Sequence, residues 1–200
     1  MKLIAWDFDG VLNRGYQDGF HEWQRTFEAD LGVSAAVFTK FIYTDANFVL
    51  VLTGQRSILD LLQDWITTHA VPHGARDVLD YWLAKDANAD DQVLGWLDAC
   101  KVPGVIATNN ETHRADFIWD TMGFSRRLGH IFASGRMGVK KPDAGFFEQI
   151  EAWSGLGACD ILLIDDAEKN IAAAAARGWQ VFHFTDATRH GLPQVLGATP

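Results

Sequence analysis

The chain has few cysteines and no long hydrophobic stretch. Of its 200 residues only Cys100 and Cys159 are cysteines, so neither a disulfide framework nor a cysteine-based zinc site can be built. The first apolar run, residues 3–6, is cut by Asp7. This run is far too short for the apolar part of a signal peptide or for a membrane span. We therefore expect a soluble protein of a reducing compartment, the cytoplasm, with no membrane partner.

Positive charge is also scarce. The sequence has 17 Lys and Arg against 26 Asp and Glu, a formal net charge of -9, and no run of basic residues. Proteins bind the phosphate backbone of nucleic acids mainly through clustered basic side chains, so the composition argues against a nucleic-acid partner. An anionic surface also repels phosphorylated small molecules at long range. A site for such molecules would need a local cation or a helix N-terminus.

What the chain does contain is a set of short apolar runs, each ending at a polar residue. Hydrophobic residues make up 48% of the sequence, which is enough for one sizeable core. The runs and the residues that follow them are 3–6 with Asp7, 105–107 with Thr108, 161–164 with Asp165, and 181–184 with Thr185. Continuous apolar runs bounded by turn signals are typical of strands buried on both faces of a sheet.

Helical patterns lie between and after these runs. They cover residues 117–122, 146–153 and 171–176, the last closed by Gly178 as a C-cap. Strands that alternate with helices predict an α/β fold, a Rossmann-like parallel sheet with helices on both faces. In that architecture the carboxyl ends of the strands form the binding crevice. We therefore expect Asp7, Thr108 and Asp165 to converge there.

Residues 14–100 have a different character. Apolar residues recur at helical spacing in two segments, Ile58, Leu61, Leu62 and Trp65, then Val78, Leu79, Trp82 and Leu83. No convincing strand pattern lies between them. We interpret residues 14–100 as a small α-helical cap inserted after the first strand, and residues 1–13 and 101–200 as the catalytic core. The alternative is a single core with long excursions.

The first strand ends in a pair of carboxylates two residues apart. Asp7 and Asp9 share one face of an extended chain, while Phe8 points into the core. Crowded carboxylates are costly unless a cation neutralises them or one keeps its proton. A metal would hold Asp7 ionised as a nucleophile, and a protonated Asp9 could donate to a leaving alkoxide. Gly10 leaves room for a close ligand. The plain alternative is a polar turn at the end of a strand.

Two further segments offer groups that bind anions. Thr108, at a strand end before a helix, presents its hydroxyl and nearby free backbone N–H groups. Lys141, directly before a helix that would start at Pro142, can neutralise a phosphoryl group and a carboxylate nucleophile together. In isolation these segments would indicate helix capping by Asn109 or Asn110 and a solvated loop charge.

The last strand run ends in two adjacent acids, Asp165 and Asp166. Magnesium prefers oxygen ligands in an octahedron and keeps some of its water. We expect Asp165 to bind such an ion directly, and Asp166 directly or through water. The alternative for Asp166 is a helix N-cap, a role that can coexist with metal binding.

In this order the four segments resemble the four motifs of the haloacid dehalogenase superfamily. The segments are Asp7-x-Asp9-Gly-Val, Thr108-Asn109, Lys141-Pro142-Asp143 and Asp165-Asp166. Residues 107–147 also resemble the helical-cap branch of that superfamily, and the helical insert lies where that branch carries its cap.

The resemblance implies a role for each motif residue. Asp7 is implied to be the nucleophile, and Asp9 the acid/base whose main-chain carbonyl also meets the Mg²⁺ ion. Thr108 and Lys141 are implied to bind phosphate, Asn109 to give a backbone N–H, and Asp165 to bind the metal.

Asp9 also separates two activities of the superfamily. The dehalogenases lack the second acid of the first motif, since halide departure requires no proton, so Asp9 favours phosphoryl transfer. The resemblance thus implies a magnesium-dependent phosphatase that acts on a small phosphorylated metabolite through an aspartyl phosphate. We expect a monomer or homodimer. Candidate substrate contacts in the insert are Tyr16, His21, Trp23, Lys40 and Arg56.

Other functions remain open at this point. A sugar-phosphate mutase would keep the aspartyl phosphate and return the phosphoryl group to a sugar, and a phosphonate-cleaving enzyme would need a Schiff-base lysine. A phospho-accepting receiver domain also uses clustered acids, a threonine and a lysine. Its acidic pair comes early in the chain, however, and it has no helical insert. An inactive scaffold of the same fold is the last alternative.

Overall fold

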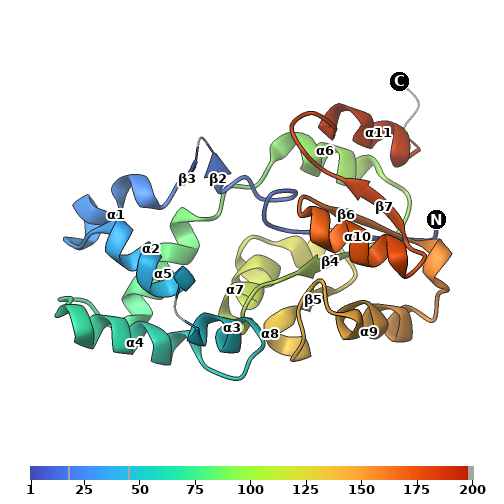
Figure 1. Cartoon of the computed structure of the whole chain (residues 1–200). Coiled ribbons are helices and arrows are strands. Elements are labelled where there is room, and N and C mark those ends of the chain that lie inside the picture. The colour runs from blue at the N-terminus through green and yellow to red at the C-terminus, as the bar shows by residue number, and fades with distance from the viewer. Residues whose placement is uncertain (18, 45, 198–200) are drawn as a thin grey trace.

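The computed structural model describes residues 1–17, 19–44 and 46–197, and its centre is a five-stranded sheet (Figure 1). The strands of this sheet are β1 (Leu3–Trp6), β4 (Gly104–Thr108), β5 (Ile131–Ala133), β6 (Ile161–Asp165) and β7 (Gln180–His183). Their order is β5-β4-β1-β6-β7, and every neighbouring pair is parallel. The predicted α/β, Rossmann-like fold is confirmed. β5 was not predicted, because three apolar residues are too few to form a recognisable strand pattern.

Helices cover both faces of the sheet because successive strand residues point to opposite sides. Ile4 and Trp6 pack with α6 (Asp91–Ala99), α7 (Thr112–Asp116) and α11 (Leu192–Val195). Leu3 and Ala5 pack on the other side with α9 (Ala144–Ser154) and α10 (Glu168–Ala176). The remaining short elements of this part are α8 (Ser134–Met137), a π-helical turn (Phe117–Thr121), and 3-10 turns at Phe124–Arg126, Ala158–Asp160 and Arg189–Gly191. Within the described ranges no helix combines the length and apolarity needed to cross a bilayer.

A second group of helices lies between β1 and α6 in the chain and beside the sheet in space (Figure 1). Its elements are β2 (Tyr16–Gln17), β3 (Phe20–His21), α1 (Gln24–Leu31), α2 (Ala35–Thr44), α3 (Asn47–Leu52), α4 (Ile58–His69) and α5 (Ala75–Lys85). These helices bury a core of their own, rich in aromatic rings. Phe38 lies against Trp65 with ring centroids 4.8 Å apart and planes at 79°, an edge-to-face contact.

Helix α6 belongs to the sheet rather than to this second core. Val93 and Leu97 of α6 are buried in the same cluster as Ile4 and Trp6. The apolar pattern of α6 is helical in either case, so the sequence could not show which core it joins. We therefore propose that the inserted unit comprises about residues 16–85, instead of the 14–100 expected from the sequence.

The structure corrects one expectation about helix starts, at Pro142, and disagrees with two of the alternatives, helix capping by Asn109 or Asn110 and by Asp166. Helix α9 begins at Ala144 with the extended Asp143 as N-cap, so Pro142, which follows a cis peptide bond, lies outside the helix. Glu111 caps α7, where its carboxylate accepts from the backbone N–H groups of residues 113 and 114, and the asparagines before it do not. Ala167 occupies the N-cap position of α10, so Asp166 is not its N-cap. The asparagines and Asp166 are therefore left for other contacts.

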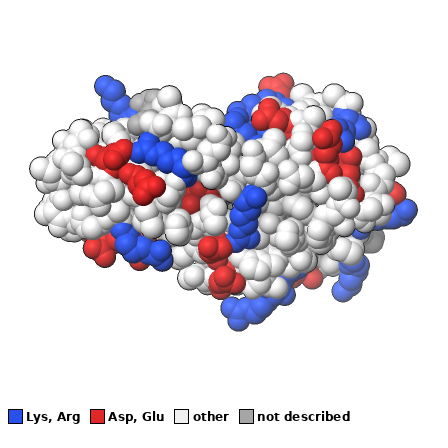
Figure 2. Space-filling model, turned by 90° about the horizontal axis from the view of Figure 1, so that it is seen from below, with Lys and Arg blue, Asp and Glu red and all other residues white. Residues whose placement is uncertain are grey.

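Charges of both signs are spread over the surface. On the face shown in Figure 2, basic and acidic side chains alternate, and lysines and arginines form no continuous patch there among the described residues. Several surface charges of the protein form ion pairs, such as Arg76 with Asp80 (3.1 Å). Exposed pairs of this kind contribute little to stability.

Truncation of Leu97 tests the assignment of α6 to the sheet. We expect Leu97→Ala to lower the free energy of unfolding by about 2–5 kcal/mol, because it removes a buried side chain of the sheet cluster. Hydrogen exchange should quicken in β1 and β4 and stay unchanged in α4. Leu50→Ala, at a residue that is 37% exposed, should change stability by less than about 0.5 kcal/mol. Faster exchange in α4 with an unchanged sheet would contradict the assignment.

Candidate active site

Three carboxylates from opposite ends of the chain meet at the carboxyl edge of the sheet. Asp7 directly follows β1, and Asp165 ends β6, which pairs with β1 so that Trp6 lies opposite Ile164. One oxygen each of Asp7, Asp165 and Asp166 lie within 4.8 Å of one another. Asp7 and Asp165 are buried, and Asp166 is exposed. Parallel pairing of two neighbouring strands therefore places the two acidic segments side by side.

The ammonium group of Lys141 lies against two of these acids. Its Nζ is 2.9 Å from Asp7 Oδ2 and 2.6 Å from Asp165 Oδ2, and the side chain is only 1% exposed. Asn109 holds the lysine backbone, because its amide donates to the Lys141 carbonyl (2.9 Å) and accepts from the Lys141 N–H (2.8 Å). Asn170 Nδ2 donates to both oxygens of Asp165 (2.9 and 3.2 Å). Hydrogen bonds from Asn109 and Asn170 thus hold Lys141 and Asp165 in place.

Burial and charge act in opposite directions on this cluster. Burial raises the pKa of Asp7 well above its ordinary value, Asp165 adds to that rise, and Lys141 opposes it. Burial acts in the same direction on Asp165, but Lys141 and the N–H donors of Ala167 and Asn170 hold its pKa below the ordinary value. Burial would lower the pKa of Lys141, which the two carboxylates raise. The single positive charge of Lys141 therefore does not neutralise the negative charge of all the carboxylates in this cluster.

The donor set fits a hard divalent cation. Three carboxylates within reach of one point supply the oxygen ligands that Mg²⁺ prefers. A second cation beside Lys141 would also relieve the cost of keeping Asp7 ionised in a buried position.

Gly10 and Thr108 line the same edge. Gly10 has φ +81°, and a Cβ at this position would overlap the carboxylate of Asp166. Both the backbone conformation and the space therefore require glycine. Thr108 ends β4 and is buried, and its Oγ1 accepts from Asn110 Nδ2 (2.7 Å).

The carboxylate of Asp9 has different partners from that of Asp7. It accepts from Arg114 Nη2 (2.7 Å), Asn110 Nδ2 (3.0 Å) and Asn13 Nδ2 (3.3 Å). It is not one of the acids grouped around Asp7 among the described residues. The side chain of Asp9 is half exposed, and it therefore faces the opening of the site.

Arg114 links Asp9 to the insert. Its other terminal nitrogen pairs with Asp86, the residue that follows α5. Asn13 Nδ2 donates to the Asp86 carbonyl (2.9 Å), and Asn13 Oδ1 accepts from the backbone N–H of Asn88 (2.7 Å). The junction between the insert and the sheet is thus bonded to the side chain of Asp9.

Sequence reasoning missed four of the residues that shape this site, Asn13, Asp86, Arg114 and Asn170. Of these four, only Asn170 could have been found from the sequence. It lies in the first turn of the helix that follows the acidic pair, and that turn faces the strand end. The contact of Arg114 with Asp9 joins residues 105 positions apart. No pattern in the sequence indicates it.

Two cavities meet beside Asp9. The first, about 570 Å³, is polar and includes Asp7, Thr108 and Asp166 in its walls. The second, about 210 Å³, extends under the insert. Asp9, Gly10, His21 and Asn109 line both.

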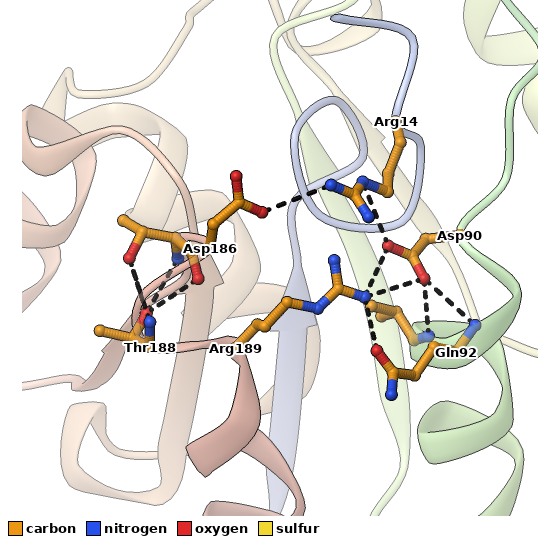
Figure 3. A network of polar contacts seen from close by, with 8 residues as sticks. Arg14, Asp90, Gln92, Asp186, Thr188 and Arg189 are labelled. Carbon is orange, nitrogen blue, oxygen red and sulfur yellow. Dashed lines mark hydrogen bonds and ion pairs between the residues drawn. The ribbon is translucent and has the colours of Figure 1, made fainter. Parts of the chain in front are cut away.

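Two arginines in the wall of the polar cavity belong to an ion-pair network (Figure 3). Arg14 pairs with Asp186 (3.3 Å), and Arg189 pairs with Asp90 (2.9 Å) and donates to Gln92 (2.8 Å). This network joins the segment after β1, the loop after β7 and the start of α6.

The expected contacts in the insert have mixed outcomes. His21 lines both cavities. Trp23 is fully buried in the core of the insert, so the expectation that it contacts substrate is wrong. Lys40 and Arg56 are not among the described residues that line the two cavities, and Arg56 pairs with Asp64. The side chain of Tyr16 lies outside the described part of the chain.

The family of the chain follows from comparison with known proteins. A family model described as haloacid dehalogenase-like hydrolase matches residues 1–178. The chain belongs to this family. A sesquiterpene phosphatase of Aspergillus oryzae is 38% identical over 69 residues, which is 34% of this chain and 35% of that protein. A phosphoglycolate phosphatase of Photobacterium profundum is 22% identical over 96% of this chain and 87% of its own length.

A solved structure shares the haloacid dehalogenase-like fold with this chain. It is a family enzyme from Bacteroides thetaiotaomicron, in complex with magnesium and inorganic phosphate, with a TM-score of 0.75 and 15% identity. The alignment covers 92% of this chain and 94% of that one. At this identity the likeness establishes the common fold.

Replacement of Lys141 tests the charge balance of the cluster. In the presence of EDTA we expect Lys141→Met to destabilise the fold by about 3–5 kcal/mol at pH 7, because it leaves buried carboxylates without their cation. Because Lys141 opposes the rise in the pKa of Asp7, its removal should raise that pKa further, so that ionising the buried acid costs the variant more stability than the wild type as pH rises. The deficit should therefore grow from pH 5 to pH 8 in urea unfolding.

The neighbouring Lys140 supplies the control. Lys140→Met should change stability by less than about 0.5 kcal/mol at both pH values, since Lys140 is only partly buried. A deficit for Lys141→Met that is small or independent of pH would contradict the charge balance described here.

Proposed function

We propose that this hydrolase is a magnesium-dependent phosphatase that cleaves a small phosphate monoester through an aspartyl phosphate on Asp7. The observation that carries the proposal is the buried cluster of Asp7, Asp165 and Lys141. Beside it lies a second acid, Asp9, which has different hydrogen-bond partners. The two relatives named as phosphatases and the related fold that holds magnesium and phosphate support it.

The metal would be held by the carboxylates of Asp7 and Asp165, by the main-chain carbonyl of Asp9, and by Asp166 directly or through water. When bound, Mg²⁺ supplies positive charge that offsets the charge of the nucleophile and of the phosphoryl oxygens. Lys141, whose Nζ lies 2.9 Å from Asp7 Oδ2, supplies a further positive charge.

In the first step a carboxylate oxygen of Asp7 attacks phosphorus in line with the ester oxygen. The bond between phosphorus and the ester oxygen breaks, and Asp9 gives its proton to that oxygen. The products are an aspartyl phosphate and a free alcohol. The Thr108 hydroxyl, the Asn109 N–H and the Lys141 ammonium bind the phosphoryl oxygens during this transfer.

In the second step Asp9, now ionised, accepts a proton from water while the water oxygen attacks phosphorus. The bond between phosphorus and Asp7 breaks, which releases inorganic phosphate and restores the carboxylate of Asp7 and the protonated carboxyl group of Asp9. Arg114 and Asn110 would act as positioning residues, because their N–H groups hold the carboxylate of Asp9.

We propose that the insert closes over the site and excludes water during the transfer. Asp86 would couple that motion to Asp9 through Arg114. We further propose that the protein acts in the cytoplasm on a small phosphorylated metabolite, as a monomer or homodimer, without a nucleic-acid or membrane partner.

Asp7→Asn is the direct test of the nucleophile. With magnesium and a panel of phosphorylated sugars, nucleotides and small acids, we expect this variant to lose turnover by on the order of 10⁴-fold or more. It should keep its fold by circular dichroism. Asp60→Asn, at an exposed acid of α4, serves as the matched control and should keep full activity. EDTA should abolish phosphate release by the wild type, and added Mg²⁺ should restore it.

Three outcomes would contradict the proposal. Equal turnover by Asp7→Asn would remove the assigned nucleophile. Conversion of a sugar phosphate to its isomer without release of inorganic phosphate would show a mutase. Phosphorylation that stops at one phosphate per chain would show a receiver domain.

A further inference from the structure

The smaller cavity has an aromatic wall supplied by the insert. His21, Tyr43, Phe48, Leu52 and Trp82 line it from that side. Tyr43 stacks on His21 with ring centroids 5.7 Å apart and planes at 11°. The same ring meets Phe48 at 5.4 Å and 81°, and Trp82 at 6.3 Å and 88°. These contacts hold the rings against one another, so the wall is preformed.

The smaller cavity adjoins the site of the proposed chemistry. Asp9, Gly10, His21 and Asn109 line it together with the polar cavity that holds Asp7 and Thr108. A phosphoryl group beside Asp7 would have its ester oxygen directed toward Asp9, the proposed proton donor. The group attached to that oxygen would then continue past Asp9 into the aromatic cavity.

The charged side chains around the smaller cavity are ion-paired or hydrogen-bonded, although Asp86 Oδ1 and Arg114 Nε have no hydrogen-bond partner among the described residues. Among the described residues that line it, Arg114 is the one Lys or Arg, and it is paired with Asp9 and Asp86. Glu111 accepts backbone hydrogen bonds at the start of α7. Burial lowers the pKa of His21, which leaves its ring neutral near pH 7. A carboxylate or second phosphate placed here would lose its hydration without gaining a free cation.

Among the described residues of its wall, the polar cavity also lacks an arginine that could bind a carboxylate of the substrate without first losing an ion pair. Its arginines, Arg14 and Arg189, are engaged with Asp90 and Asp186 (Figure 3). These pairs would have to break before either guanidinium could bind a carboxylate of the substrate.

We propose that the substrate is the phosphate monoester of an uncharged, apolar alcohol, whose hydrocarbon group occupies the cavity walled by His21, Tyr43, Phe48, Leu52 and Trp82. This inference rests on the proposed phosphatase function. The cavity volume of about 210 Å³ sets the size of that group. An apolar cavity of about 150 Å³ accepts benzene, so the site fits an aromatic ring or a branched chain of similar bulk.

The test compares monoesters of alcohols by kcat/KM for release of inorganic phosphate. The panel is methyl phosphate, n-butyl phosphate, benzyl phosphate, 2-phosphoglycolate and phosphocholine, assayed with Mg²⁺. We expect benzyl and n-butyl phosphate to exceed methyl phosphate by on the order of tenfold or more, because the added carbons are buried in an apolar cavity. Both should also exceed the charged esters.

A pair of variants in helix α3 connects the preference to the cavity. Leu52 lines it, whereas Leu50 is exposed and is not among the residues that line it. We expect Leu52→Lys to lower the ratio of kcat/KM for benzyl phosphate to that for methyl phosphate at least tenfold, and to raise the relative rate with 2-phosphoglycolate. Leu50→Lys should leave the ratio unchanged. Phe48→Ala, a milder change in the same wall, should lower the ratio as well.

The outcomes separate this inference from the proposed function. Turnover that favours 2-phosphoglycolate would overturn the apolar substrate while leaving the phosphatase in place. A preference for phosphocholine would do the same, and would show that the aromatic wall binds a cationic leaving group. An unchanged ratio in both wall variants would mean that the cavity does not hold the leaving group. Absence of turnover with every ester would overturn the phosphatase itself.

Discussion

The buried ammonium of Lys141 between the carboxylates of Asp7 and Asp165 is the contact on which the rest of the site depends. Bringing these charges out of water costs several kcal/mol for each ion, which only close and fully bonded partners can offset. The protein supplies such partners: Asn109 holds the lysine backbone, and Asn170 holds Asp165. Because these residues come from different parts of the chain, the cluster also fixes how the loops after β4 and β6 lie relative to the segment before α9.

The second organising feature is a division of tasks between two cores. The sheet and its flanking helices bury one set of apolar side chains on each face, and the insert buries an aromatic core of its own. The proposed reacting groups, Asp7 and Asp9, lie just after β1 at the edge of the sheet. The apolar walls of the smaller cavity come from the insert. Asp9 stands at the border, where Arg114 bonds it to Asp86.

The sequence predicted the fold and the convergence of the residues that follow β1, β4 and β6, because both depend on local signals. Each strand of the predicted core is a short apolar run, and parallel pairing then puts the residues that follow β1, β4 and β6 at one edge. The contacts of Arg114 with Asp9 and Asp86 could not be predicted, since they depend on how the insert sits on the sheet. For the same reason the sequence could not indicate that α6 packs on the sheet and not on the core of the insert. The start of α9 was misplaced because Pro142 is compatible with a first helical turn, while the backbone stays extended through Asp143.

We propose that Asp7, Asp165 and Asp166 would hold one divalent ion while Lys141 stays paired with Asp7. A crystal of the protein soaked in Mn²⁺, which prefers the same oxygen ligands, tests it most directly through anomalous scattering. We predict a single strong anomalous peak within about 2.0–2.5 Å of oxygens of Asp7 and Asp165, with Lys141 still paired to Asp7. A peak bound elsewhere, or a displaced Lys141 with no peak between the two acids, would contradict the account.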